Sequence, residues 1–222
     1  MAPIDQGTIN YRDELVRKLI HLSSLSIPIV YYFTPRSAAI IILGILSAAA
    51  VILDLSRYFY PQVGKVFYSV FGFLLRRHEV DEKKKNLNGA TYVLISALIC
   101  AIIFPKVFFI TGFTILIISD SSAALIGRKF GKHKFLAKSL EGTLAFFISA
   151  SIVVLFTPKI ENLSTEYLIG IIAAAVGAIV ENVSFGFADD NLSIPISICL
   201  TMWVLYLLML PGISLTLTNV PH

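Results

Sequence analysis

Long apolar runs separated by short polar segments make up most of the chain from Leu19 onward. A bilayer core is spanned by about 20 apolar residues, or slightly fewer where the ends are anchored, so each run predicts a membrane-spanning helix. Seven such helices are expected, at residues 19–34, 37–54, 89–105, 107–126, 142–157, 167–181 and 192–210. The pattern therefore predicts an all-α, polytopic membrane protein in which residues 1–222 form a single integral-membrane domain.

Residues 58–78 depart from this pattern, because they are too polar to span a membrane and too aromatic for a free loop. Apolar side chains that include Phe67 and Phe71 share one face at helical spacing, and Lys65 and Arg76 follow the opposite face. This is typical of an amphipathic helix lying in the membrane interface. Phe67 and Phe71 are therefore candidates for a lateral lipid entrance, although a plain surface connector explains the pattern equally well.

Composition and charge agree with a membrane protein and give it an orientation. Of the residues, 56% are hydrophobic and only 14% are charged, with a mean hydropathy of +0.81. If the N-terminus is inside, 15 of the 18 lysines and arginines fall on the inner side, which predicts an N-in, C-out topology. Residues 1–18 then form a cytoplasmic segment, and their polar start gives no sign of a cleavable signal peptide. The expected compartment is the endoplasmic reticulum or nuclear envelope of a eukaryote, or the inner membrane of a prokaryote.

The stretch from Ile118 to Lys132 carries the strongest chemical signal. Asp120 lies in an apolar helix among small residues, where a carboxylate is costly and marks a functional-site candidate. Gly127, Arg128, Lys129 and Gly131 follow in what reads as a glycine-rich, cationic turn that phosphate could approach. Together they predict a metal–nucleotide site at the inner membrane surface.

Further candidates lie at the same predicted face, and each has a simpler alternative. Arg17 and Lys18 could clamp nucleotide phosphates or contact lipid headgroups, and His21, a turn deeper, points toward an inward role such as lipid binding. Asn88 could contact the nucleotide or cap a helix. Lys138, Ser139 and Glu141 lie where the chain re-enters the membrane, where Ser139 suits an N-cap and Glu141 suits the helix dipole. Glu181, Asp189 and Asp190 suggest a divalent metal, or a capping Asp beside a solvated one.

Carboxylates, cations and glycines on one face are what phosphoryl or nucleotidyl transfer requires. A divalent ion bridges phosphate oxygens, cations neutralise charge, and a carboxylate orients the attacking hydroxyl. The sequence has no Walker A motif and no soluble-kinase motif set. Cys100 and Cys199 lie in apolar runs and are expected to be buried free thiols.

Seven motifs resemble, in the same order, those of the CTP-dependent lipid kinases, a superfamily of diacylglycerol, dolichol and phytol kinases. They are Arg17-Lys18-x-x-His21, Leu53-Asp54-Leu-x-Arg57, Leu75-Arg-Arg-x-Glu79, Asn88-Gly89, Ser119-Asp-x-x-Ala-Ala-x-Ile-Gly-Arg-Lys-x-Gly131, Lys138-Ser-Leu-x-Gly142 and Asp189-Asp-Asn-Leu-x-Ile-Pro195. The resemblance covers nearly the whole chain and is strongest to the CTP-dependent diacylglycerol kinases, whose long polar N-terminal extension is missing here.

The resemblance implies transfer of the γ-phosphoryl group of CTP to a lipid hydroxyl, with Mg²⁺ or another divalent cation such as Ca²⁺. Arg17 and Lys18 would hold phosphates, Asp120 would bind metal or act in catalysis, and Lys138 would neutralise charge. Gly127 and Gly131 would bring backbone N–H groups near the phosphates, and Asp189 and Asp190 would complete the metal site.

Other functions stay open at this point. Two of the motifs are also similar to those of phosphatidate cytidylyltransferases, which use CTP for a different transfer. A transporter or lipid-binding scaffold is a further alternative, although the polar groups are expected on one side only. The expected partners are CTP, a lipid alcohol and the membrane, with no nucleic acid, and the oligomeric state is left open.

Overall fold

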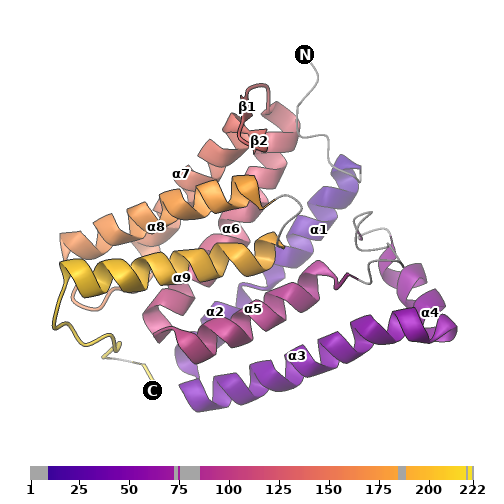
Figure 1. The fold of residues 1–222 in the computed structure, drawn as a ribbon, viewed down its shortest axis with the longest axis horizontal. Helices are drawn as coiled ribbons and strands as arrows, with labels where there is room; N and C mark the ends of the chain where they lie inside the picture. Colours follow the sequence, from indigo (N-terminus) through magenta and orange to yellow (C-terminus); the bar gives the residue numbers. More distant parts are fainter. Residues whose placement is uncertain (1–9, 73–74, 76–85, 185–188, 219, 222) are drawn as a thin grey trace.

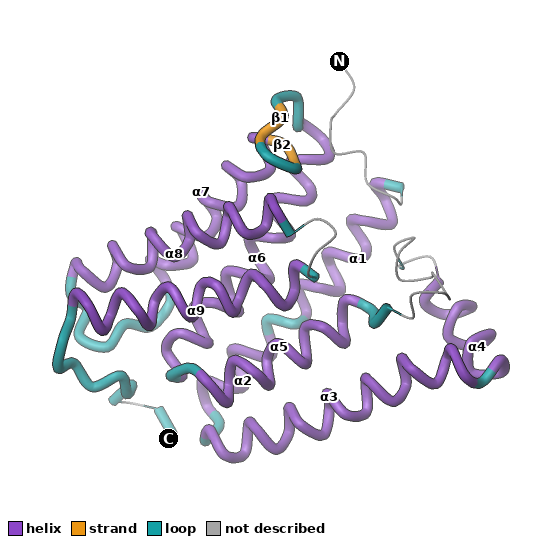
Figure 2. The backbone as a smooth tube through the Cα atoms, viewed as in Figure 1, coloured by secondary structure: helices purple, strands orange, loops and turns teal. Residues whose placement is uncertain are grey.

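The computed structural model describes residues 10–72, 75, 86–184, 189–218 and 220–221, and the structural statements below concern these residues. Parts of the expected cytoplasmic segment (1–9) and of the expected interfacial helix (73–74 and 76–78) lie outside the described residues. Residues 76–79 of the motif Leu75-Arg-Arg-x-Glu79 also lie outside them. The elements, drawn in Figures 1 and 2, are α1 (Tyr11–Ser23), α2 (Ser26–Phe33), α3 (Arg36–Phe59), α4 (Pro61–Phe71), α5 (Gly89–Ile103), α6 (Lys106–Phe130), β1 (Lys134–Phe135), β2 (Lys138–Ser139), α7 (Leu140–Phe156), α8 (Ser164–Val183) and α9 (Asp190–Met209).

The fold is all-α, as predicted, except for one small ribbon. The strands β1 and β2 pair antiparallel and were not predicted, because two-residue strands leave no periodic pattern in a sequence. Four helices, α3, α6, α8 and α9, are long and apolar enough to cross a membrane, and α5 and α7 are shorter apolar helices. The protein is therefore polytopic, whereas the full set of seven spans and their orientation stay predictions.

The first expected span, 19–34, is interrupted rather than continuous. The N–H of Ile27 donates to Ser24 O at 2.9 Å, a tighter turn than an α-helix makes. Pro28 explains the break, because proline has no N–H for the carbonyl four residues earlier and its ring clashes with that carbonyl. The chain consequently forms α1 and α2 instead of one helix, so the prediction of an unbroken span is wrong.

The end of α3 and the helix α4 form a corner. Asp54 and Arg57 are buried inside α3 as a local ion pair, with Arg57 Nε 3.1 Å from Asp54 Oδ1. Phe67 of α4 is buried, and Cζ of the Arg57 guanidinium lies 4.8 Å from the centroid of the Phe67 ring. Phe71, by contrast, is exposed. The predicted helix lies within 58–78 but begins at Pro61, and its lipid contacts stay a prediction.

Helix α6 is the central element of the fold. It is the most enclosed of the four long helices and packs against α1, α2, α5, α7 and α9. It also extends further than the predicted 107–126, since the N–H of Gly131 still donates to Gly127 O at 2.9 Å. Gly127, Arg128 and Lys129 are therefore helical, and the prediction that they form a turn is wrong. Cations in a last helical turn complement the helix dipole, which favours this longer helix.

The helices α7, α8 and α9 pack closely because small residues line their contacts. A Cβ atom built on Gly170 of α8 would lie 2.5 Å from Val154 Cγ1 of α7, and one on Gly177 would lie 2.9 Å from Ile198 Cδ1 of α9. These glycines therefore have a structural role. Cys100 and Cys199 are free and buried, again as predicted.

We expect Gly170→Val to destabilise the protein by about 1–3 kcal/mol, because the new side chain would overpack the α7–α8 contact. Thermal unfolding in detergent, followed by far-UV circular dichroism, measures the effect. Gly44→Ala in α3 is the control, since its Cβ would meet nothing within 4 Å. Equal midpoints for the two variants would contradict the packing role of Gly170.

Candidate active site

A buried ion pair between Lys18 and Asp120 joins α1 to α6. The Nζ atom of Lys18 lies 2.5 Å from Asp120 Oδ2, and both side chains are at most 5% exposed. His21, one turn further along α1, places Nε2 3.7 Å from the same oxygen. Asp120 therefore faces the interior of the helix bundle. A buried carboxylate is tolerable here because a cation and an imidazole meet it.

A second acidic residue, Glu14, organises the arginines beside this pair. Its Oε1 accepts from Arg17 at 2.6 Å, and its Oε2 accepts from Arg128 of α6 at 3.1 Å. Glu14 is buried, so the two guanidinium groups are fixed rather than extended into solvent. Sequence analysis overlooked Glu14. Its i,i+3 spacing to Arg17 on a helix was the available signal.

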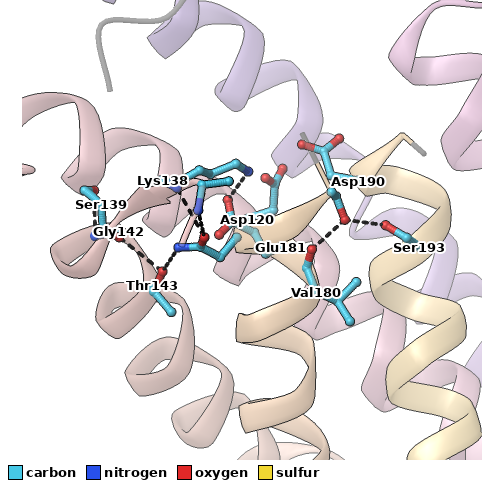
Figure 3. Close-up of polar contacts among 12 residues, drawn as sticks. Asp120, Lys138, Ser139, Gly142, Thr143, Val180, Glu181, Asp190 and Ser193 are labelled. Carbon is cyan, nitrogen blue, oxygen red and sulfur yellow. Dashed lines mark hydrogen bonds and ion pairs between the residues drawn. The ribbon is translucent and has the colours of Figure 1, made fainter. Parts of the chain in front are cut away.

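The strand β2 brings Lys138 to the same end of the bundle. Lys138 Nζ lies 2.5 Å from Glu181 Oε1 of α8, and Figure 3 shows this pair beside Asp120 and Asp190. The neighbouring Asn182 fixes the ribbon, because its Oδ1 accepts from the N–H groups of Ala137 and Lys138 at 2.8 and 3.2 Å. The Nδ2 of Asn182 donates to Thr143 of α7 at 2.6 Å. Asn182 thus positions Lys138, a role that sequence analysis did not assign.

The protonation of Lys138 follows from its surroundings. Burial disfavours its charge, but the attraction of Glu181, with smaller contributions from Asp190 and Asp120, outweighs burial and raises the pKa of Lys138 above its ordinary value. Lys138 is therefore a cation throughout the neutral and mildly alkaline range. It is available to neutralise phosphate charge, as the sequence motif predicts.

Gly131 and Gly142 allow close packing where α6, β2 and α7 meet. A Cβ on Gly131 would lie 2.3 Å from Gly127 O and 2.7 Å from Ser139, and one on Gly142 would lie 3.1 Å from Ala123 O. Ser139 caps α7, as predicted, by accepting from the N–H of Gly142 at 3.2 Å. The glycines therefore let α6, β2 and α7 meet directly. Contact of the Gly127 and Gly131 backbones with phosphate stays a prediction.

Three other residues were predicted to contact the nucleotide, and two of them, Glu141 and Asn88, have polar partners within the protein. Glu141 accepts from the backbone N–H of Lys132 and lies 2.7 Å from His133 Nδ1, so it closes the turn that leads to β1. Asn88 caps α5 by accepting from the Thr91 N–H at 2.9 Å, and its own N–H donates to Asp54. Lys129 is exposed on α6. Their binding of nucleotide stays a prediction.

The predicted metal ligands do not form one compact cluster. In the described part of the chain, no three His, Cys, Asp or Glu side chains gather closely enough to hold a metal ion. Asp189 caps α9 by accepting from the N–H and the amide of Asn191 at 3.0 and 2.8 Å. Mg²⁺, however, usually takes only one or two protein carboxylates together with substrate phosphates and water. Binding of a metal ion by Asp120, Glu181, Asp189 and Asp190 therefore stays a prediction.

Comparison with known proteins relates this arrangement to a family. The chain is 32% identical to an uncharacterized protein of Rickettsia prowazekii, over 87% of this chain and 95% of that protein. It is 28% identical to the CTP-dependent diacylglycerol kinase 1 of Schizosaccharomyces pombe, over 89% of this chain and 94% of the yeast protein. A segment covering 39% of the chain is 38% identical to 17% of the dolichol kinase of the same yeast. No family model and no solved structure matches.

The chain is therefore a distant homologue of the CTP-dependent lipid kinases, as the motifs indicated.

We expect Glu14→Gln to weaken the binding of CTP about tenfold, because Arg17 and Arg128 would lose the anion that holds them in place. Equilibrium dialysis with labelled CTP measures this affinity without turnover. Asp13→Asn, on the same helix and at a more exposed position, is the matched control. Unchanged affinity in Glu14→Gln would show that the two arginines do not depend on Glu14.

Removing the partner of Lys138 should alter the pH dependence of activity. In Glu181→Gln the burial of Lys138 persists while its main attraction is lost, so the pKa of Lys138 falls. Lysine function is lost as pH rises through its pKa, so the alkaline limb of the pH–rate profile should move to lower pH. The profile of Lys134→Ala, an exposed residue of β1, should match that of the wild type. An alkaline limb that stays in place in Glu181→Gln would exclude this coupling.

Proposed function

We propose that the protein is a membrane-embedded kinase that transfers the γ-phosphoryl group of CTP to a lipid hydroxyl, with diacylglycerol as the acceptor and phosphatidate as the product. The observation that carries this proposal is the buried Lys18–Asp120 pair, which lies beside three further cations, Arg17, Arg128 and Lys138. Burying so many charged side chains in an apolar bundle is costly and marks a functional site. The negative charge of a triphosphate complements the positive charge of these cations.

In the proposed reaction, the bond between the γ-phosphorus and its bridging oxygen breaks while the lipid oxygen bonds to the phosphorus. CDP leaves, and the lipid hydroxyl loses its proton. Arg17, Arg128 and Lys138 bind the phosphates and balance their charge. Asp120, oriented by Lys18, positions the lipid hydroxyl and accepts its proton. A Mg²⁺ ion held by Asp120 and Asp190 would supply further neutralisation of the phosphate oxygens.

The choice of acceptor rests on the extent of the similarity. The yeast protein named CTP-dependent diacylglycerol kinase aligns over 94% of its length, whereas the dolichol kinase aligns over 17% of its own. Diacylglycerol is therefore the acceptor we propose. A polyprenol such as dolichol, or phytol, presents a similar hydroxyl on an apolar body and is the alternative acceptor.

An assay with purified protein, CTP and a panel of lipid alcohols tests the activity. CTP labelled at the γ-phosphate should transfer its label to diacylglycerol, with CDP as the second product. Release of the label in pyrophosphate would instead identify a cytidylyltransferase that acts on phosphatidate. CTP-independent transport or binding without turnover of any lipid would favour a transporter or scaffold and overturn the kinase proposal.

We expect Asp120→Asn to lower the rate of lipid phosphorylation at least about 100-fold, because the amide cannot accept the hydroxyl proton. The uncharged side chain can still accept a hydrogen bond from Lys18 but no longer balances its charge, so thermal unfolding should show a folded protein with a lowered midpoint. Lys134→Ala, in the exposed strand β1, should keep the wild-type rate. Near-normal turnover by a folded Asp120→Asn variant would remove Asp120 from the mechanism.

A further inference from the structure

The ribbon of β1 and β2 ends in an apolar tip that the protein leaves exposed. Phe135, the last residue of β1, is 37% exposed, and Leu136, which begins the short turn to β2, is 54% exposed. Figure 1 shows the ribbon at the opposite edge of the bundle from α3 and α4. The tip therefore gains little burial from the rest of the fold.

The backbone of Leu136 is in an unfavourable conformation for leucine. Its φ angle is 52°, in the left-handed region. This region is sterically unfavourable for a residue with a Cβ atom, so glycine is usual in such tight turns. Because Leu136 is also poorly buried, packing within the protein does not offset the cost of its conformation. A strained and exposed leucine points to a contact outside the fold.

Hydrogen bonds hold the ribbon in this position. The N–H of Leu140 donates to His133 O at 2.8 Å, across the base of the ribbon. On one side of the tip Glu141 accepts from the N–H of Lys132 at 3.1 Å, and on the other Asn182 accepts from the N–H of Ala137 at 2.8 Å. These bonds fix the backbone on both sides of the tip, so its apolar side chains are held outward instead of folding back onto the bundle.

The length of α7, the expected span 142–157, places the ribbon at the membrane surface. With 17 residues, α7 is about 25 Å long, slightly shorter than a hydrocarbon core of about 30 Å. A spanning α7 therefore cannot lift its first residue far above the core. Ser139, the last residue of β2, caps that first turn. The ribbon consequently begins where the hydrocarbon core ends, at the depth of the lipid headgroups.

Cations accompany the apolar tip. Lys132, at the base of the ribbon, is exposed. Phe130, at the end of α6, is 53% exposed, and Lys129 Nζ lies 5.3 Å from its ring centroid. Exposed apolar side chains beside cations are typical of a surface that enters the membrane interface. This end of the bundle is the one expected to be cytoplasmic, and the cytoplasmic leaflet carries the anionic lipids that complement such cations.

We propose that the tip of the ribbon inserts into the membrane interface beside α7, and that Lys132 binds the headgroups of anionic phospholipids there. Lys138 lies two residues after Leu136, so this contact fixes the depth of the Lys138–Glu181 pair relative to the headgroups. The proposal concerns contact with the membrane and does not depend on the proposed kinase function.

Fluorescence quenching by brominated lipids tests the proposal without turnover. Trp203 is the only tryptophan of the chain, so Trp203→Phe with Phe135→Trp places a single fluorophore at the tip. The full-length protein is reconstituted in vesicles of phosphatidylcholine and phosphatidylglycerol, with one or the other lipid brominated near the top of its acyl chains. We expect both to quench the tip, and phosphatidylglycerol to quench it about twofold more at equal mole fraction, because Lys132 attracts it.

Two further variants in this background separate the roles of charge and apolar contact. Lys132→Gln should abolish the difference between the two lipids, whereas Lys65→Gln, at an exposed position of α4, should keep it. Leu136→Gly should weaken quenching by both lipids. It should nevertheless unfold in detergent at or above the midpoint of the parent, because glycine adopts the left-handed conformation without strain.

Three results would overturn the proposal. A tip that neither brominated lipid quenches lies in water, and equal quenching by the two lipids excludes the binding of anionic headgroups. A lowered unfolding midpoint in Leu136→Gly, with quenching unchanged, would show that Leu136 serves the packing of the protein and not the membrane. Absence of kinase activity would leave each of these measurements interpretable, since none of them requires CTP or a lipid alcohol.

Discussion

The attraction between Lys18 and Asp120 is the constraint on which the rest of this structure depends. Either charge alone would be strongly unfavourable among apolar helices, and at 2.5 Å each makes the other tolerable. The pair also fixes the fold, since it holds the amphipathic α1 against the most enclosed helix, α6. Removing one partner from a buried pair typically costs about 3–5 kcal/mol, so the site and the packing of α1 are not separable.

The same logic extends to the neighbouring charges. Glu14 joins α1 to α6 through Arg17 and Arg128, and Glu181 joins α8 to β2 through Lys138. In this state of the protein every one of these cations has a carboxylate partner. An incoming triphosphate would thus meet cations that carboxylates already hold in place, without placing charge in an empty apolar cavity. Ligand binding and the relations between helices are therefore linked by the same side chains.

Much of the fold could be predicted, because long apolar runs have few structural alternatives. The caps at Ser139 and Asn88, the close-packed Gly170 and the buried Asp120 also followed from local rules. Three of the features that did not follow depend on tertiary contacts. The small ribbon depends on the tertiary contact of Asn182 with the backbone at Ala137 and Lys138.

The other two failures have equally specific causes. The end of α6 at Gly131 packs against Ser139, which only the fold brings close. The role of Glu14 depends on Arg128, which lies 114 residues away in sequence. Long-range pairing of this kind leaves no trace in spacing. Single-sequence reasoning therefore identified the charged side chains of the site other than Glu14, but not how they share partners.

The interruption at Pro28 has a consequence for how the molecule is built. Without a continuous ladder of backbone hydrogen bonds across Ser24, the direction of α1 is not inherited from α2. It is set by what α1 touches on α6. The helix that supplies Lys18 and His21 is therefore a separately docked part, joined to its apolar neighbour by a corner. Substitutions in α1 can therefore alter the charged end of the protein while α2 and its contacts remain as they are.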